Sequence, residues 1–278
     1  MKATLLSLVV LLLPFAASAT PAADRRAKAG VARLEASEAG RVVLRGINTH
    51  GGLDAWFGGS ALRFRYAYRP VDRPARDTLQ TVDLIRSRAY HDVYSPATGR
   101  MAFDGTDAWS TFDPKLIAAR FWNLTPYYFV GMPFVFADPG LNLEVIDDAP
   151  SAAGLPKSTV VRVTFGEAVG DAPDDYYIAY FAEADGRLLA VRYVVSYPAF
   201  FKGAEVSHTP EKLLVFERVE PLGPLKVSRR HVFYAFGEGK RGDVVSEAIV
   251  SETAYGVPFD ESQLVMPAGA VIDRSLEN

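Results

Sequence analysis

The sequence has no cysteine among its 278 residues. A disulfide therefore cannot stabilise the folded chain, and packing together with backbone hydrogen bonds must do so instead. A thiol nucleophile is excluded for the same reason, as is a lipid anchor attached to cysteine. The chain is nevertheless long enough to bury a large hydrophobic core as one domain.

An excess of charge of either sign is also missing. Lysine and arginine number 30 against 33 aspartate and glutamate residues, which gives a formal net charge of −3. Nucleic-acid-binding proteins usually carry a strong basic excess, so we expect no nucleic-acid partner. With 49% hydrophobic and 12% aromatic residues, the composition is that of an ordinary globular protein.

Only one long hydrophobic run is present, and it lies at the N-terminus. A basic start precedes the apolar run Leu5 to Phe15, and small residues from Ala17 to Ala19 offer a signal-peptidase site. The run is too short to cross a membrane, which takes roughly 20 residues. We therefore predict a signal peptide at residues 1–19 and one soluble domain at residues 20–278, exported to the periplasm or the extracellular space without a membrane span.

Hydrophobic periodicity divides the remaining chain into a helical and a β part. Residues 20–50 have helical spacing, and Gly51-Gly52 ends the predicted helix at His50. From Leu62 the period becomes two, which is typical of a strand with one apolar face. Similar runs predict further strands at 79–92, 100–104, 107–112, 158–166, 175–183, 187–197, 212–219, 226–237 and 243–255.

Short turn sequences, such as Asp104-Gly105 and Asp185-Gly186, join several neighbouring runs and favour β-hairpins. Strands and helices do not alternate, so a parallel doubly wound sheet is not expected. We predict an α+β fold in which a single, strongly curved antiparallel sheet of about 9–11 strands forms an open half-barrel around a helical plug.

An aromatic-rich segment at residues 115–137 interrupts the β pattern. Pro126 and Pro133 exclude one long helix and predict two short helical pieces, or a helix and an irregular segment. Such a segment needs an apolar partner surface, which the concave face of the sheet can supply. The strand around Tyr177 is apolar on both faces and must be covered twice, or must face a cavity.

The order of these features resembles that of the lipoprotein-carrier (LolA/LolB-like) superfamily. The resemblance is carried by HGGLDAW at residues 50–56, by DGTDAW at residues 104–109 and by the long meander. It extends to an uncharacterised bacterial branch through MPFVFADPG at residues 132–140, GDAPDDYYIAYF at residues 170–181 and GVPFDESQLVMP at residues 256–267. The resemblance implies a half-barrel whose concave face, closed by helices, takes up acyl chains.

Two interpretations of the aromatic residues remain open at this stage. They are either ordinary core, or they line or close a hydrophobic pocket, as the resemblance implies. The candidate ligand-binding residues are Trp109, Phe121, Trp122, Tyr128, Phe129, Met132, Phe134 and Phe136. Under the second interpretation the protein is a non-enzymatic monomer that binds an apolar small molecule or lipid. An envelope protein is a further candidate partner, and we expect no cofactor and no metal.

Catalytic motifs are scarce, and each candidate has a simpler structural interpretation. His50, paired with Asp54 or Asp104, is the basis of an alternative, an envelope hydrolase, although the helix end explains His50 as well. His91 and Asp92 are adjacent on a strand and must point to opposite faces. A third hypothesis is a fully packed structural or interaction domain without a ligand.

Three further motifs are most simply structural. The GxGxxG match at residues 237–242 is followed by a strand pattern, which indicates a hairpin rather than a phosphate site. Asp171, Asp174 and Asp175 suit a turn better than a calcium site. Arginines form a basic face on the strand at 62–69 and in the residues that follow it. Solvent exposure is the simplest explanation of this face, and attraction to anionic groups is the alternative. The face comprises Arg63, Arg65, Arg69, Arg73 and Arg76.

Overall fold

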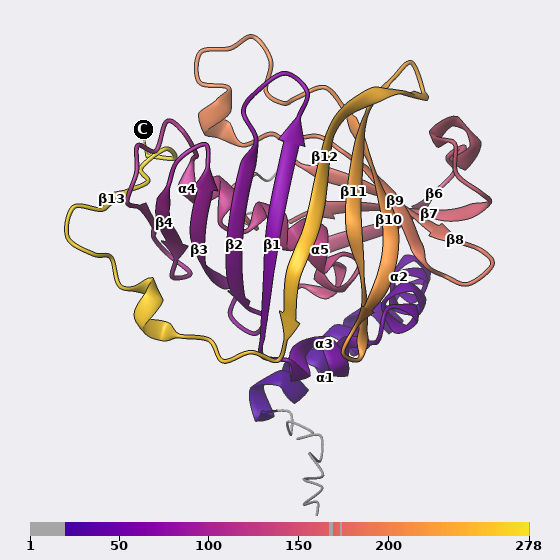
Figure 1. Ribbon diagram of the computed structural model, residues 1–278. Helices are drawn as coiled ribbons and strands as arrows, with labels where there is room; N and C mark the ends of the chain where they lie inside the picture. Colours follow the sequence, from indigo (N-terminus) through magenta and orange to yellow (C-terminus); the bar gives the residue numbers. More distant parts are fainter. Residues whose placement is uncertain (1–19, 167–168, 173, 278) are drawn as a thin grey trace, which may run out of the picture.

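One antiparallel sheet of 13 strands organises the protein, in the order β13-β5-β4-β3-β2-β1-β12-β11-β10-β9-β8-β7-β6. The computed structural model describes residues 20–166, 169–172 and 174–277, so the predicted signal peptide lies outside the described residues. The sheet curves strongly and does not close, since β13 and β6 are its two edges (Figure 1). The predicted α+β half-barrel is thereby confirmed.

The sheet consists of two meanders joined in its middle by the pairing of β1 with β12. The first meander contains β1 (Ala61–Pro70), β2 (Arg76–Asp83), β3 (Arg88–Ser95), β4 (Gly99–Phe103) and β5 (Ala108–Ser110). The second contains β6 (Leu141–Ile146), β7 (Ser158–Phe165), β8 (Tyr176–Ala182), β9 (Leu188–Tyr193), β10 (Lys212–Leu222), β11 (Leu225–Gly237) and β12 (Lys240–Tyr255), and the short β13 (Val271–Ile272) pairs with β5.

The number of strands exceeds the predicted 9–11 for two reasons. The run at 79–92 is two strands, β2 and β3, because the chain turns after Asp83 and returns at Arg88, with Ser87 at a φ of 53°. The edge strands β6 and β13 have partly exposed side chains and therefore lack a clear apolar face. The predicted hairpin turns are present, and Asp104 accepts hydrogen bonds from the amides of Thr106 and Asp107, both at 2.8 Å.

Three N-terminal helices pack at one end of the half-barrel (Figure 1): α1 (Pro21–Glu35), α2 (Glu38–Thr49) and α3 (Leu53–Gly58). Ser37 separates α1 from α2, because its hydroxyl caps α2 by accepting the amide of Gly40 at 3.0 Å. The predicted helix end at His50 is confirmed. Gly51 follows at a φ of 128°, and a Cβ there would lie 2.6 Å from the carbonyl oxygen of Pro224.

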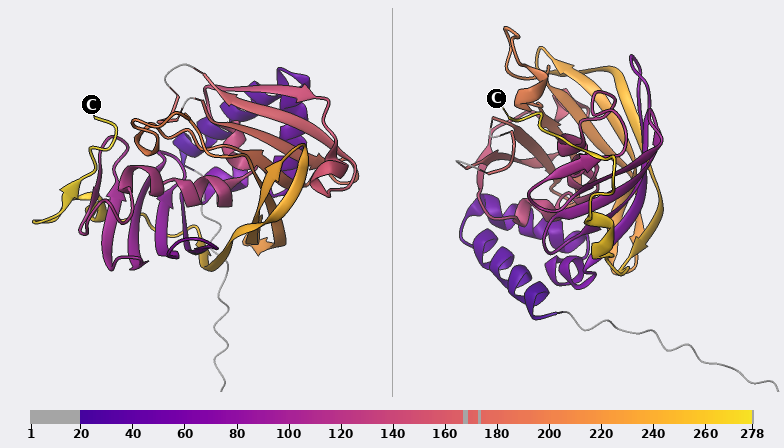
Figure 2. Two further views of the ribbon diagram at one scale, coloured as in Figure 1. Left: turned by 90° about the horizontal axis from the view of Figure 1, so that it is seen from above. Right: turned by 90° about the vertical axis from the view of Figure 1, so that its left-hand side faces the viewer.

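The aromatic segment lies inside the curve of the sheet (Figure 2) and consists of short helical pieces, as predicted. These are α4 (Ala119–Trp122), α5 (Thr125–Gly131) and the 3₁₀ turn η1 (Phe134–Ala137). Pro126 falls in the first turn of α5, where its missing N–H costs no hydrogen bond, and Pro133 lies between α5 and η1. Sheet and segment together form the predicted wrapped plug.

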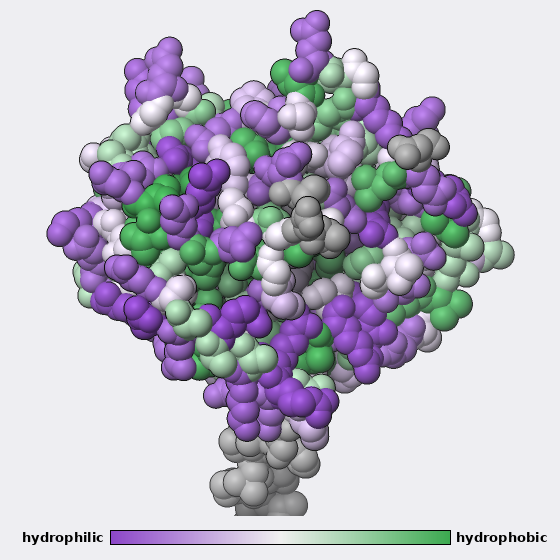
Figure 3. Space-filling model, turned by 180° about the vertical axis from the view of Figure 1, so that it is seen from behind, coloured by the Kyte–Doolittle hydropathy of each residue, from purple (hydrophilic) through white to green (hydrophobic). Residues whose placement is uncertain are grey.

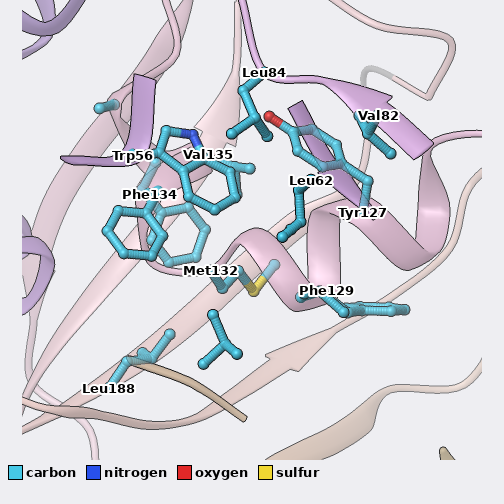
Figure 4. Close-up of a cluster of buried hydrophobic side chains, with 14 of the residues drawn as sticks. Trp56, Leu62, Val82, Leu84, Tyr127, Phe129, Met132, Phe134, Val135 and Leu188 are labelled. Atoms are coloured by element: carbon cyan, nitrogen blue, oxygen red, sulfur yellow. The ribbon is translucent and has the colours of Figure 1, made fainter. Parts of the chain in front are cut away.

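The main core lies where this plug meets α3 and the sheet (Figure 4). The rings of Trp56 and Phe134 stack with centroids 4.5 Å apart and an interplanar angle of 4°. Tyr127 stacks on the same indole at 6.1 Å. Phe134 is 1% exposed, so this end of the plug is fully packed.

A second, smaller core covers the convex face of the strands β7–β11 and contains Ala153, Val160, Ile178, Tyr180, Ala190, Leu213 and Phe236. The 3₁₀ turn η2 (Pro150–Ala153) contributes Ala153 to this cluster. The strand around Tyr177 is therefore covered on its convex face by this cluster, while Tyr177 itself belongs to the main core. Across the described part of the chain, no helix combines the length and apolar character that a membrane crossing requires.

Candidate ligand-binding site

A cavity of about 430 Å³ lies on the concave side of the sheet, between the helices α4 and α5 and the strands β7–β9. This side faces the viewer in Figure 3, where hydrophobic side chains are visible among hydrophilic ones. Small-molecule sites usually measure roughly 300–1,000 Å³. The lining includes Phe103, Arg120, Phe121, Leu124, Thr125, Tyr128, Phe129, Phe165, Val169, Asp171, Asp175, Tyr177, Tyr193, Val195 and Tyr197.

The inner wall of the cavity is aromatic and comes from paired strands. The hairpin between β8 and β9 places Tyr177 directly opposite Tyr193, with ring centroids 6.1 Å apart. Phe129 reaches across from α5 to Tyr193 at 5.3 Å, and Phe165 packs against the edge of Tyr177 at 6.2 Å. Burial raises the pKa of both tyrosines well above the ordinary value, so their hydroxyls stay neutral donors at physiological pH.

The outer part of the cavity is polar, and a bidentate ion pair dominates it. Arg120 donates from Nε and Nη2 to the two carboxylate oxygens of Asp171, at 2.6 and 3.0 Å. A further Arg120 nitrogen donates to the carbonyl of Thr106, and its guanidinium lies 5.1 Å from the ring centre of Phe103. This pair ties α4 to the loop after β7, so it fixes one side of the cavity mouth.

Asp175 also lines the cavity, and burial raises the pKa of its carboxyl group to about 6. The amide of Ser196 donates to this carboxylate and partly opposes the effect of burial. Tyr197 lies on the same side of the cavity, and its hydroxyl is 2.8 Å from that of Ser275. The cavity thus combines an apolar wall with a few polar groups at one side.

The structure separates the eight predicted ligand-binding residues into two groups. Phe121, Tyr128 and Phe129 line the cavity. The other five do not: Met132, Phe134 and Phe136 are 4%, 1% and 2% exposed within the main core, and Trp109 and Trp122 are buried at 3% and 4%.

The two tryptophans have structural partners of their own. Trp109 donates from Nε1 to the carbonyl of Leu264 at 2.8 Å, which holds the C-terminal segment against the sheet. Trp122 borders a second hollow of about 450 Å³ that also contacts Phe121, so the ring of Phe121 separates the two hollows.

The eight predicted residues include neither Tyr177 and Tyr193 on the strand side of the cavity nor Arg120 on α4, although the strand around Tyr177 was expected to be covered twice or to face a cavity. The Asp185-Gly186 turn predicts the β8–β9 hairpin, but a two-residue turn there would place Tyr177 opposite Val194. An irregularity between Tyr180 and Phe181 shifts the register so that Tyr177 pairs with Tyr193. No comparable signal exists for Arg120, since its partner Asp171 is 51 residues away in the chain.

His50 does not form the dyad that a hydrolase would need. Its Nδ1 lies 2.9 Å from the carbonyl oxygen of Lys226, and among the described residues nothing hydrogen-bonds its Nε2. Burial lowers its pKa, whereas Asp54 and Asp104 lie on the exposed surface and do not contact it. The interpretation of His50 as a helix-terminal residue therefore agrees with the geometry.

Two other histidines are buried beneath the plug and are neutral. His91 Nε2 lies 3.0 Å from the carbonyl oxygen of Asn123, and Tyr66 Oη lies 3.1 Å from Nδ1 of His231. Burial lowers the pKa of each imidazole to about 3. His91 is buried while Asp92 is exposed, which confirms that the two point to opposite faces.

The remaining motifs have structural roles. The glycine-rich sequence at 237–242 is the predicted hairpin, in which Gly237 pairs with Lys240. No group of three or more His, Asp or Glu side chains in the described ranges could hold a metal ion. On the basic face, Arg65 pairs with Asp77 at 2.7 Å and with Glu252 at 2.9 Å, whereas Arg76 lies over the ring of Trp122.

Comparison with solved structures finds similar folds at low sequence identity. A LolA superfamily protein from Nitrosomonas europaea aligns with a TM-score of 0.53 and 11% identity, over 82% of this chain and 97% of that chain. For a DUF1329 family protein from Desulfovibrio piger the TM-score is 0.49 at 10% identity, over 88% and 98%. For a putative outer membrane lipoprotein-sorting protein domain from Vibrio parahaemolyticus it is 0.48 at 10% identity, over 81% and 94%.

No protein-family model matches the sequence, and no curated protein matches it significantly. The structural alignment with the Nitrosomonas europaea protein confirms the predicted resemblance to the lipoprotein-carrier superfamily at the level of the fold. A shared fold does not assign a ligand or an activity.

Proposed function

We propose that the protein is an exported, non-enzymatic binding protein that takes up the apolar part of a lipid or acyl chain in the cavity between the plug and β7–β9. Residues 20–278 would act as one domain after removal of residues 1–19. The observation that carries the proposal is the cavity itself, which has a volume of about 430 Å³ and an inner wall that includes Phe129, Tyr177 and Tyr193.

The fold and the chemistry of the lining support the same ligand class. The resemblance to the lipoprotein-carrier superfamily implies uptake of acyl chains on the concave face of a half-barrel, which is where the cavity lies. Aromatic and aliphatic side chains gain free energy by excluding water from an apolar chain, about 0.8 kcal/mol for each buried methylene. The ordering of the ligand and the loss of its free motion offset part of this gain.

Native mass spectrometry of freshly purified protein tests the proposal directly. We expect a population with the added mass of a lipid or fatty acid, and uptake of the neutral probe N-phenylnaphthylamine once the protein has been delipidated. A ligand-free spectrum together with no uptake of the probe would contradict the proposal and favour the packed interaction domain.

A variant that fills the cavity gives the matched comparison. Leu124 lies at the start of α5 and lines the cavity, so Leu124→Trp should reduce probe uptake by at least about tenfold at little cost in stability. Val145→Trp, on the exposed edge strand β6, adds the same ring outside the cavity and should leave uptake unchanged. Equal uptake by both variants would place the probe elsewhere.

A further inference from the structure

Arg76 is a partly buried cation without a counterion. Its guanidinium lies 4.7 Å from the ring centre of Trp122, and among the described residues no hydrogen bond or ion pair engages its side chain. Its neighbour in sequence, Asp77, is occupied by Arg65. Burial lowers the pKa of Arg76, which means that the protein environment as it stands disfavours this charge.

Neighbouring charge of the same sign acts on Arg76, because Arg73 also lowers its pKa. Lys212, at the start of β10, is also partly buried; burial, Arg73 and Arg76 lower its pKa, and Asp72 opposes them. Asp72 is paired with Arg73 at 3.1 Å and also acts on Lys212, whereas among the described residues it makes no ion pair with Arg76. Two desolvated cations that repel each other create a local field that favours an anion.

Arg76 also lines the second hollow, which has a volume of about 450 Å³. Its cationic lining residues are Arg76, Lys115 and Arg274, of which Arg274 is paired with Glu277 at 2.6 Å, and Asp273 contributes a carboxylate. Both oxygens of Asp273 already accept backbone amides, from Arg120 and Ser275, at 2.8 and 2.9 Å. An anion in this hollow would therefore meet the unpaired guanidinium of Arg76, while the oxygens of Asp273 are hydrogen-bonded to backbone amides.

The two hollows adjoin each other. Phe121 lines both, and its ring packs on Tyr197 of the first cavity at 5.1 Å and on Phe200 of the second hollow at 4.9 Å. The partly exposed ring of Phe121 is thus shared by the cavity with the aromatic wall and by a hollow whose lining includes three cationic side chains. A molecule with an apolar chain and an anionic end would match both compartments.

We infer that the hollow beside Arg76 and Trp122 binds the anionic head group, a carboxylate or phosphate, of an amphiphile whose apolar chain occupies the cavity beyond Phe121. The inference rests on the proposed function and narrows its ligand class. Arg76 supplies a planar, fixed pair of N–H donors, held in place by its stacking on the indole. Lys212 adds charge without a fixed geometry.

Displacement of bound N-phenylnaphthylamine by matched amphiphiles tests the head-group site. Dodecanoate and dodecanol have the same chain and differ in charge at about pH 8, where the carboxyl group is ionised. We expect the wild-type protein to prefer dodecanoate by about tenfold, since a charge-assisted hydrogen bond is worth roughly twice a neutral one. Arg76→Gln should abolish this preference and leave the affinity for dodecanol unchanged.

Two further variants keep the test decisive if Arg76→Gln folds poorly. Lys212→Gln should reduce the preference two- to threefold, as expected for a cation acting at a distance, by roughly 0.5 kcal/mol. Arg63→Gln removes an exposed arginine from the same sheet and should change neither affinity. An unchanged preference in both the Arg76 and the Lys212 variant would overturn the inference.

The outcomes distinguish the inference from the function beneath it. Equal, Arg76-independent binding of dodecanoate and dodecanol would overturn the head-group site and leave apolar binding intact. If neither amphiphile binds while inorganic phosphate is bound in an Arg76-dependent way, both the amphiphile and the proposed function are overturned in favour of a free-anion site. Binding of dodecanoate that phosphate displaces and Arg76→Gln weakens supports the inference.

Discussion

The two ends of the aromatic plug have the same kind of sequence and opposite surroundings. At its C-terminal end, Phe134 is sandwiched against Trp56 and is 1% exposed. At its N-terminal end, Phe121 and Tyr128 are partly exposed and border hollows. In Figure 4, Phe129 lies apart from the stacked pair of Trp56 and Phe134.

The difference arises from the helices α1–α3, which cover only one end. Arg26 and Arg33 of α1 reach the C-terminal end of η1, where Arg26 pairs with Asp138 at 2.9 Å and Arg33 donates to the carbonyl of Ala137. In the described part of the chain, α4 instead packs on β4, β5 and α5, and its residues also border the two hollows. Aromatic density alone therefore does not separate core from lining; the covering element decides.

The largest expected effect tests the packed end. Phe134→Ala removes a ring that is stacked on Trp56 and leaves a buried void, so the free energy of unfolding should fall by about 3–5 kcal/mol. Urea unfolding followed by tryptophan fluorescence measures it. A loss below about 1 kcal/mol would mean that this end is as loosely packed as the other, and the contrast between the ends would disappear.

The second prediction concerns the two buried histidines beneath the plug and the dependence of stability on pH. His91 and His231 have a pKa of about 3 in the folded protein, below the ordinary 6.5, so the unfolded chain binds protons more readily. Their contribution to stability is complete above about pH 6.5 and is lost as the pH falls toward 3. Each histidine should add about 1.4 kcal/mol per pH unit to the slope in that window.

The slope of unfolding free energy against pH, from urea titrations between about pH 6 and pH 4, measures this contribution. His91→Gln keeps a donor toward the carbonyl of Asn123 and should remove one histidine's share of the slope. His208→Gln changes an exposed histidine and should leave the slope as it is. A slope that His91→Gln does not alter would argue against a neutral buried imidazole.

The sheet was predictable because strand periodicity is local. The alternation from Leu62 to Tyr68 depends on which side chains face the core, and the hairpin turns fix the neighbouring strands. The edge strands were missed because exposed edges carry no such alternation. The pairing of β1 with β12 joins residues far apart in the chain, such as Tyr66 and Val250, and local patterns do not encode it.

The site was predictable only in part for a related reason. The composition of the plug identified Phe121, Tyr128 and Phe129, yet it selected Phe134 and Phe136 equally, because all five belong to the same aromatic segment. What distinguishes them is the position of α1–α3, which depends on tertiary contacts. Arg76 was likewise assigned to an exposed basic face, although its place at the start of β2 lets it stack on Trp122.

A third prediction tests the open end. Phe121→Ala removes a partly exposed ring, so we expect a loss of about 1 kcal/mol or less in stability, far below that of Phe134→Ala. Because this ring separates the two hollows, its removal should instead speed the uptake and release of N-phenylnaphthylamine, which stopped-flow fluorescence measures. Unchanged rates together with a loss of several kcal/mol would identify Phe121 as core.

The smallest effect has the opposite dependence on pH and belongs to the cavity. Burial raises the pKa of Asp175 to about 6, above its unfolded value, so the protonated form is favoured in the folded protein. Stability from this group is gained as the pH falls below 6 and is lost above it, by less than about 1 kcal/mol because Asp175 is only partly buried. Asp175→Asn should remove that contribution, while exposed Asp54→Asn should not.

Since Asp175 lines the cavity, its protonated, neutral form should also favour an apolar probe. The protein should therefore retain the probe better at about pH 5 than at about pH 7, and Asp175→Asn should not show this difference. An equal pH dependence of retention in the wild type and in Asp175→Asn would place the probe away from Asp175.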